Sequence, residues 1–158
     1  MYIRFTKMHG LGNDFVVIDA VTQTVAMTAK LARRLANRNT GIGCDQLLLV
    51  EPPSQPDVDF KYRIFNADGS EVAQCGNGAR CFTKFVHDRG LTGKSSLKVE
   101  TQGGILQLSI DDKQNYTATL GIPKFEPESI PFEAAERALT YAIEVEKKIL
   151  DVAALSLG

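Results

Sequence analysis

Two continuous apolar runs limit the folds open to this chain more than any other feature. The runs are FVVIDA at residues 15–20 and QLLLVE at residues 46–51. Because successive strand residues point to opposite faces of a sheet, an unbroken apolar run is typical of a strand buried on both faces. We therefore expect a sheet covered on two sides, in a chain whose 158 residues suggest one domain, or one domain with part of another.

The remaining strand signals are short and alternate between apolar and other residues, as expected of half-buried strands. They lie at Ile3–Phe5, Phe60–Ile64, Leu97–Val99, Leu106–Ile110 and Tyr116–Leu120. The sequence DDKQN at 111–115 joins the last two and predicts a hairpin loop. Many short strands around few helices indicate an α+β domain rather than a doubly wound α/β sheet.

Two helices are predicted. Thr28 can cap the first, over residues 29–39, with Leu31 and Leu35 on one face and Gly41 as its stop. The second is expected from about Gly76 to Asp88, with Gly90 ending it. Its expected core residues are Ala79, Phe82, Phe85 and Val86.

The proline-punctuated segment at 122–132 predicts a domain junction. The residues after it are too few to build a core of their own. We therefore expect residues 1–119 to form a first domain, and residues 120–158 to form a junction and the incomplete start of a second.

Charge and composition argue against several classes of protein. The net charge is −1 and the pI about 6.1, without a basic stripe, so we expect no nucleic-acid partner. No apolar run has the length of a membrane span or of a signal peptide, so we expect a cytoplasmic protein with no membrane partner. Three cysteines without CxxC spacing argue against a disulfide framework, since thiols stay reduced in that compartment.

Cys75 is the residue most suited to chemistry. It lies in NADGSEVAQCGNGARC, at the expected start of the second helix, where free N–H groups and the helix dipole favour an anion. Gly76 and Gly78 let backbone approach a substrate closely, and Asn77 tolerates a left-handed conformation. The pattern leaves two readings open, a thiolate that acts as base or nucleophile and a buried structural cysteine.

The other cysteines and the acidic residues nearby have simpler explanations. We expect Cys44 and Cys81 to pack in the core. A metal site is not expected, because Cys75, Cys81 and His87 would lie on different faces of the helix. Asp68 and Glu71 are expected to serve as turn and cap residues, since the alternating acidic loop of a calcium site is missing.

A glycine-rich turn, KMHGLGNDF at 7–15, is the second candidate region. It lacks the third glycine and the following helix of a dinucleotide-binding fingerprint, so a nucleotide cofactor is not expected. Asn13 is the better candidate there. Its amide could hold a carboxylate or an amine, or it could only stabilise the turn.

Three segments taken together resemble the diaminopimelate epimerase family, in the family's order: KMHGLGNDF, GIGCDQLL at 41–48 and RIFNADGSEVAQCGNGARC at 63–81. The resemblance implies two pseudo-symmetric domains, each a β-barrel-like mixed sheet around a central helix. It also implies epimerisation of LL-2,6-diaminopimelate to the meso form, on the route to lysine and peptidoglycan. The family uses no cofactor, and its full-length members are expected to be homodimers.

The resemblance assigns roles to six residues. The family's two cysteines, one per domain, face opposite sides of the substrate Cα, and the first corresponds to Cys75. Substrate-binding positions correspond to Asn13, Gln46 and Asn66, with neighbouring donors at Gly76 and Asn77.

The free-energy cost of removing the substrate's α-proton indicates that the site must be enclosed. If the α-proton's pKa exceeds that of the thiol by about 10 units, the gap is about 14 kcal/mol. A helix dipole supplies at most about 2 kcal/mol and one oriented donor about 3–4 kcal/mol, so several donors in a closed site are needed.

The chain ends at Gly158, ahead of the family's second cysteine motif. We therefore expect a fragment that is inactive alone. The alternatives are a related racemase acting on another small amino acid, a half-protein that binds a ligand without catalysis, and a dimer that pairs two copies of Cys75.

Overall fold

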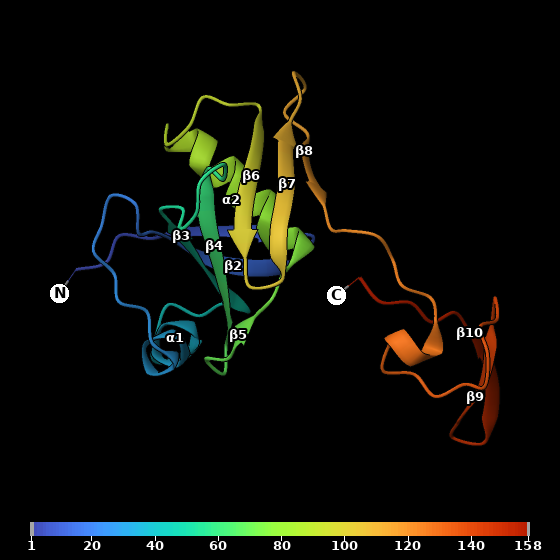
Figure 1. The fold of residues 1–158 in the computed structure, drawn as a ribbon. Coiled ribbons are helices and arrows are strands. Elements are labelled where there is room, and N and C mark those ends of the chain that lie inside the picture. The colour runs from blue at the N-terminus through green and yellow to red at the C-terminus, as the bar shows by residue number, and fades with distance from the viewer. Residues whose placement is uncertain (1, 158) are drawn as a thin grey trace. The chain divides into compact units, whose positions relative to one another are not determined.

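The computed structural model describes residues 2–157 and divides into two compact units, one reaching to Leu120 and the other starting at Gly121 (Figure 1). The first unit holds one sheet with the strand order β1-β2-β3-β4-β6-β7-β8, and β5 pairs with β4. The strands are β1 (Thr6–Gly10), β2 (Asn13–Asp19), β3 (Gln46–Glu51), β4 (Phe60–Asn66), β5 (Glu71–Val72), β6 (Ser96–Thr101), β7 (Gly104–Ile110) and β8 (Tyr116–Thr119).

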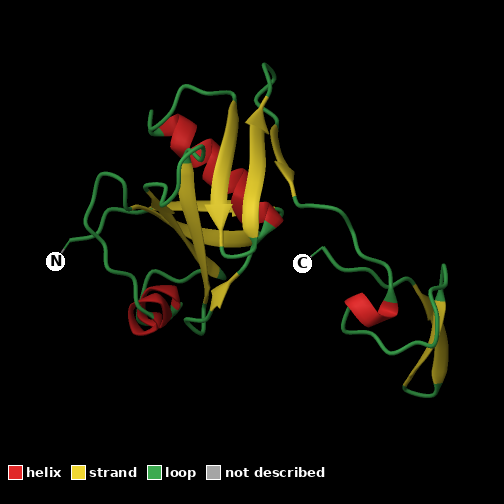
Figure 2. Cartoon of the chain, viewed as in Figure 1, coloured by secondary structure: helices red, strands yellow, loops and turns green. Residues whose placement is uncertain are grey.

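The sheet is mixed and curls around one helix (Figure 2). The pairs β2–β3 and β4–β6 are parallel, and the other pairs are antiparallel. Helix α2 (Gly76–Asp88) contacts strands at both ends of the sheet, β1 and β2 as well as β7 and β8. Helix α1 (Ala29–Ala36) contacts β3 and β4. The expected α+β fold, a β-barrel-like mixed sheet around a central helix, is confirmed.

The two central strands are buried on both faces, as their apolar runs predict. In β2, Phe15 and Val17 belong to the hydrophobic cluster around α2, whereas Val16 and Ile18 belong to the cluster around α1. All four are 0% exposed. Strand β3 divides between the two clusters in the same way. One sheet therefore separates two cores, and α2 lies in the larger one.

The expected strands are confirmed with one exception. Residues 3–5 are not in a strand, and β1 begins only at Thr6. The reason is a side chain that takes the place of a neighbouring strand: Gln23 accepts from the Arg4 N–H at 2.8 Å and donates to the Arg4 carbonyl at 3.0 Å. The hairpin loop at 111–115 is confirmed between β7 and β8.

Both helices are found, and the first is shorter than expected. Thr28 caps α1 by accepting from the Leu31 N–H at 3.2 Å. The helix ends at Ala36 rather than near Asn39, because the Asn37 side chain accepts the N–H groups of residues 39 and 40, each at 2.8 Å. Helix α2 has the predicted bounds, and its four expected core residues are at most 3% exposed.

The second unit is small and is described by itself. It contains a 3₁₀ turn at Pro127–Ser129 and an antiparallel hairpin of β9 (Tyr141–Val145) and β10 (Lys148–Val152). Both hydrophobic clusters of the described chain lie in the first unit. The candidate site is also built from residues of the first unit.

Candidate active site

The sheet topology brings three distant polar residues to one edge. Strands β2 and β3 are parallel, so their first residues lie together, and Phe15 pairs with Gln46. Strand β4 runs the other way, which places its last residue, Asn66, opposite Gln46. Asn13 begins β2 and pairs with Gly10 across the tight turn from β1. The three motifs singled out in the sequence therefore meet at a single edge of the sheet.

Helix α2 begins at this same edge with Cys75 as its N-cap residue. The half-buried Cys75 sulfur accepts from the Gly78 N–H at 3.4 Å. On its other side the sulfur lies 3.8 Å from Asn13 Oδ1. A partly exposed thiol at a helix N-terminus is the environment in which cysteine chemistry is found. The expected position of Cys75 at the start of the helix is confirmed.

Gly78 allows the first turn of α2 to rest directly on the sheet. A Cβ atom at this position would lie 2.2 Å from the Tyr62 hydroxyl oxygen and 3.2 Å from a Leu48 methyl carbon. The Tyr62 hydroxyl is buried and makes no hydrogen bond within residues 2–157. Burial raises the pKa of Tyr62 well above its usual range, and the nearby Cys75 and Cys81 add to the effect.

Gly76 and Asn77 form the first turn after Cys75. Gly10 packs closely against Asn77, since a Cβ atom on Gly10 would lie 3.5 Å from Asn77 Cβ. Arg80 donates to Asn77 Oδ1, which orients that amide. The turn before β2 and the start of α2 are thus packed against each other beside Cys75.

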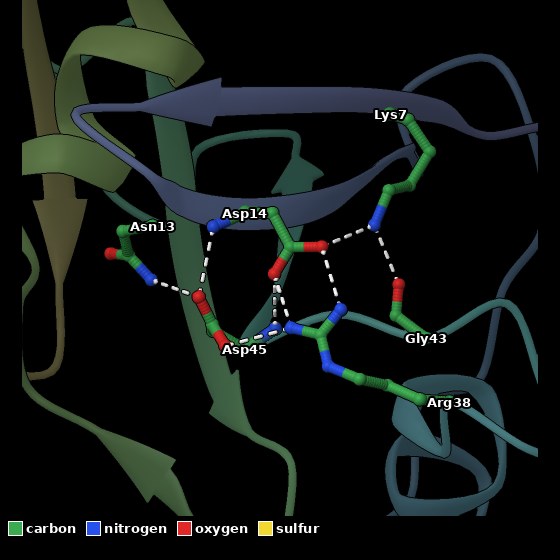
Figure 3. Close-up of polar contacts among 6 residues, drawn as sticks. All are labelled: Lys7, Asn13, Asp14, Arg38, Gly43 and Asp45. Carbon is green, nitrogen blue, oxygen red and sulfur yellow. Dashed lines mark hydrogen bonds and ion pairs between the residues drawn. The ribbon is translucent and has the colours of Figure 1, made fainter.

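A charged cluster contacts the Asn13 amide (Figure 3). Asn13 Nδ2 donates to Asp45 Oδ2 at 3.1 Å. Arg38 bridges the two carboxylates, with 2.6 Å to Asp14 Oδ1 and 2.8 Å to Asp45 Oδ1. Lys7 adds an ion pair to Asp14 at 2.7 Å.

The cluster keeps both carboxylates ionised. Hydrogen bonds from the Arg38 guanidinium hold the pKa of Asp14 far below its usual range, and Lys7 acts in the same direction. The pKa of Asp45 is lowered by the Asp14 N–H and by the Asn13 amide, with a further contribution from Arg38.

A second polar chain orients the amides of Gln46 and Asn66. Ser70 Oγ donates to Asp68 at 2.6 Å and accepts from Asn66 Nδ2 at 3.1 Å. Asn66 Oδ1 then accepts from Gln46 Nε2 at 2.9 Å. The remaining oxygen, Gln46 Oε1, is buried and has no hydrogen-bond partner within residues 2–157. It is an acceptor left over at the site edge.

The six residues selected from the sequence all lie at this edge, in two contacting pairs and one helical turn. Cys75 contacts Asn13, and Gln46 contacts Asn66, while Gly76 and Asn77 follow Cys75. Sequence reasoning missed Asp14, Asp45 and Arg38. The one available signal was the position of Asp45 directly before Gln46 in GIGCDQ.

Other expectations in this region can also be compared with the structure. Cys44 and Cys81 are only 2% and 5% exposed and belong to the two cores, and burial raises the pKa of both thiols. Asp68 is a turn residue, as expected, and accepts the Ser70 N–H at 2.8 Å. The expectation that Glu71 caps a helix is wrong, because it lies in β5 and binds the Arg63 guanidinium at 2.7 Å.

Residues 2–157 contain no group of His, Cys, Asp and Glu side chains placed to hold a metal ion. No helix in the same range has the length and apolar character needed to cross a membrane.

Comparison with known sequences gives one family. The sequence profile described as diaminopimelate epimerase matches residues 5–126. A diaminopimelate epimerase of Pseudomonas aeruginosa (strain PAO1) is 57% identical over the whole chain, and one of Ectopseudomonas mendocina (strain ymp) is 53% identical. The chain spans 57% of the length of each relative.

Solved structures agree on the fold. A probable proline racemase from Agrobacterium radiobacter K84 superposes with a TM-score of 0.67 at 17% identity, over 98% of this chain and 49% of that one. A hydroxyproline epimerase from Agrobacterium vitis gives 0.65 at 15% identity, over 96% and 48%. At such identities the likeness shows the fold alone, whereas the profile covers most of the first unit and includes the whole site edge. This chain belongs to the diaminopimelate epimerase family.

Proposed function

We propose that this chain supplies one half of the active site of a cofactor-independent epimerase that converts LL-2,6-diaminopimelate to meso-diaminopimelate. The observation that carries the proposal is the partly exposed Cys75 at the N-terminus of α2, beside the amide of Asn13. Family membership supplies the substrate, because the similar sequences are named diaminopimelate epimerases.

In the proposed reaction Cys75 exchanges a proton with the substrate Cα on one face. Epimerisation requires removal of the α-proton from one side of the carbon and delivery from the other, so a second acid or base must lie opposite. As the α-proton leaves, negative charge develops on the substrate carboxylate. The free N–H groups of the first turn of α2, at Gly76 and Asn77, are suited to stabilise that charge.

Asn13, Gln46 and Asn66 are proposed to hold the polar groups of the substrate. Their amides lie at the same edge as Cys75 and are oriented by hydrogen bonds to carboxylates or to each other. Such orientation before substrate arrives lowers the reorganisation needed in the transition state.

We propose that the second thiol does not come from residues 2–157 of the same chain. Cys44 and Cys81 are buried in the two cores, so neither can reach the opposite face of a substrate bound at Cys75. We therefore propose that the 158-residue chain by itself does not turn over LL-diaminopimelate.

Family membership also suggests the domain organisation, oligomeric state and compartment of the full-length enzyme. We propose that residues 1–119 are the first of two pseudo-symmetric domains and that residues 120–158 begin the second. The full-length enzyme is proposed to be a cytoplasmic homodimer acting on a small molecule, with no nucleic-acid or membrane partner. Light scattering on the full-length protein tests the dimer, and a single-subunit mass would contradict it.

A chimera tests the catalytic proposal. Residues 1–158 replace the corresponding part of the Pseudomonas aeruginosa relative, and meso product is measured by chiral chromatography. We expect activity in the chimera and its loss in Cys75→Ala, because Cys75 is the group proposed to exchange a proton with the substrate Cα. Cys81→Ala, on the same helix but in the core, is the matched control and should keep activity. Equal rates for Cys75→Ala and Cys81→Ala would refute the role of Cys75.

A further inference from the structure

We propose that Asp45 is a positioning residue that fixes the Asn13 amide, so that the Asn13 carbonyl oxygen accepts a hydrogen bond from the Cys75 thiol and favours its protonated form. The inference rests on the proposed function, since it concerns the state in which Cys75 waits for substrate. It gives a role to Asp45, which is not among the site residues predicted from the sequence.

Asp45 fixes the orientation of the Asn13 amide. An ionised carboxylate only accepts hydrogen bonds, so the group that faces Asp45 must be the NH₂ of Asn13. Asp45 Oδ2 accepts from Asn13 Nδ2 at 3.1 Å and from the Asp14 N–H at 3.0 Å. The reversed amide would place a carbonyl oxygen against that carboxylate. Asn13 Oδ1 is thereby directed to the Cys75 sulfur, 3.8 Å away.

Two contacts at the Cys75 sulfur have opposite effects on its protonation. The Gly78 N–H, 3.4 Å from Sγ, stabilises a thiolate. Asn13 Oδ1 can only accept, so it stabilises the thiol and opposes the thiolate. The two contacts act in opposite directions, and Asp45 determines the sign of one of them.

The other titratable neighbours do not replace this control. Tyr62 on β4 and Cys81 on α2 interact electrostatically with Cys75, and burial raises the pKa of both above their ordinary values. Both groups are therefore harder to ionise than an ordinary tyrosine or cysteine. Arg38 pairs with both Asp14 and Asp45, and Lys7 pairs with Asp14.

The test is the alkylation rate of Cys75 by iodoacetamide against pH, on the folded 158-residue chain. Mass spectrometry of the peptides separates Cys75 from the two core cysteines. Asn13→Ala removes the acceptor from the thiol, so the pH midpoint of alkylation should fall by about one unit. An unchanged or raised midpoint would overturn the proposal, because it would mean that Asn13 stabilises the thiolate.

Asp45→Asn tests whether Asp45 acts on the Cys75 thiol through Asn13. The amide introduced at position 45 no longer dictates how Asn13 is turned, so Asn13 can present a donor to the sulfur. The pH midpoint of Cys75 alkylation should therefore fall at least as far as in Asn13→Ala. The matched control is Asp14→Asn, which removes the same charge from the same cluster but leaves the Asn13–Asp45 hydrogen bond. Combined with Asn13→Ala, Asp45→Asn should cause no further shift.

The proposal would be overturned if Asp14→Asn and Asp45→Asn shifted the pH midpoint equally, or if the shifts were additive in the double variant. Either result would mean that the charge of the cluster, and not the orientation of Asn13, acts on Cys75. Circular dichroism verifies that each variant is folded, and Asn13→Ala decides the sign if Asp45→Asn does not fold. A Cys75 that reacts only after unfolding contradicts the proposed function together with the inference. A reactive Cys75 whose midpoint ignores these substitutions contradicts the inference alone.

Discussion

At the scale of single residues, the site depends on how closely α2 approaches the sheet. The position of Cys75 was predictable, because a glycine-framed cysteine before an apolar helical pattern is a local signal. The supporting residues were not, because Asp14 and Asp45 are distant in sequence and meet only when β2 and β3 pair in parallel. Local sequence reports a helix start but carries no information on which carboxylate lies behind an asparagine.

Gly78→Ala should destabilise the fold, although alanine normally stabilises a helix. The added Cβ would lie 2.2 Å from the Tyr62 hydroxyl oxygen, so we expect a loss of about 1–3 kcal/mol in the free energy of unfolding. Urea denaturation measures it. Unchanged stability would show that the helix can lift away without cost.

Tyr62→Phe should be neutral or slightly stabilising and should partly rescue Gly78→Ala. The hydroxyl that it removes is buried and has no hydrogen-bond partner among residues 2–157, and it is the atom nearest to the new methyl group. The same urea experiment on the double variant gives the answer. A double variant no more stable than Gly78→Ala alone would contradict the proposed clash.

At the scale of elements, the apolar runs correctly predicted the doubly buried strands β2 and β3, and the capping pattern predicted both helices. The first helix was overestimated because Asn37 offers its side chain to the next two N–H groups, and a run of helix-forming residues does not reveal that competition. Strand order was beyond reach, since nothing in residues 46–51 specifies a parallel neighbour.

The carboxylate cluster links β1, β2 and the segment before β3, so its ionisation should affect how firmly these elements hold together. The pKa of Asp14 and that of Asp45 are lower in the folded chain than when unfolded. The stability that these two carboxylates add to the fold is therefore fully present above their unfolded pKa of about 4. It is lost as the pH falls through their folded pKa values. The urea midpoint should drop as the pH is lowered from 5 to 3.

Asp14→Asn should flatten that dependence, and Asp112→Asn, in the exposed hairpin loop, serves as its control. Identical pH profiles for the two variants would show that the cluster contributes nothing to acid stability. The size of the effect is expected to be small, because both carboxylates are partly exposed to water and ions.

At the scale of the whole molecule, the first unit holds both hydrophobic clusters and the complete site edge. A chain ending at Leu120 should therefore unfold in urea with the same midpoint as residues 1–158. Circular dichroism and the alkylation of Cys75 provide two independent readouts. A large loss of stability in the shorter chain would show that the first unit needs the residues after Leu120.

The parallel pairing of β2 with β3 has a consequence for the order of folding. Strands β6, β7 and β8 follow one another along the chain and are joined by short loops, so little chain has to be closed when they pair. Strands β2 and β3 can pair only after the segment that contains α1 has crossed between them. Asn13 and Cys75 are farther apart still, 62 residues along the chain. We expect the thiol to gain its contact with Asn13 among the last events of folding, so that a newly made chain is compact before its site is assembled.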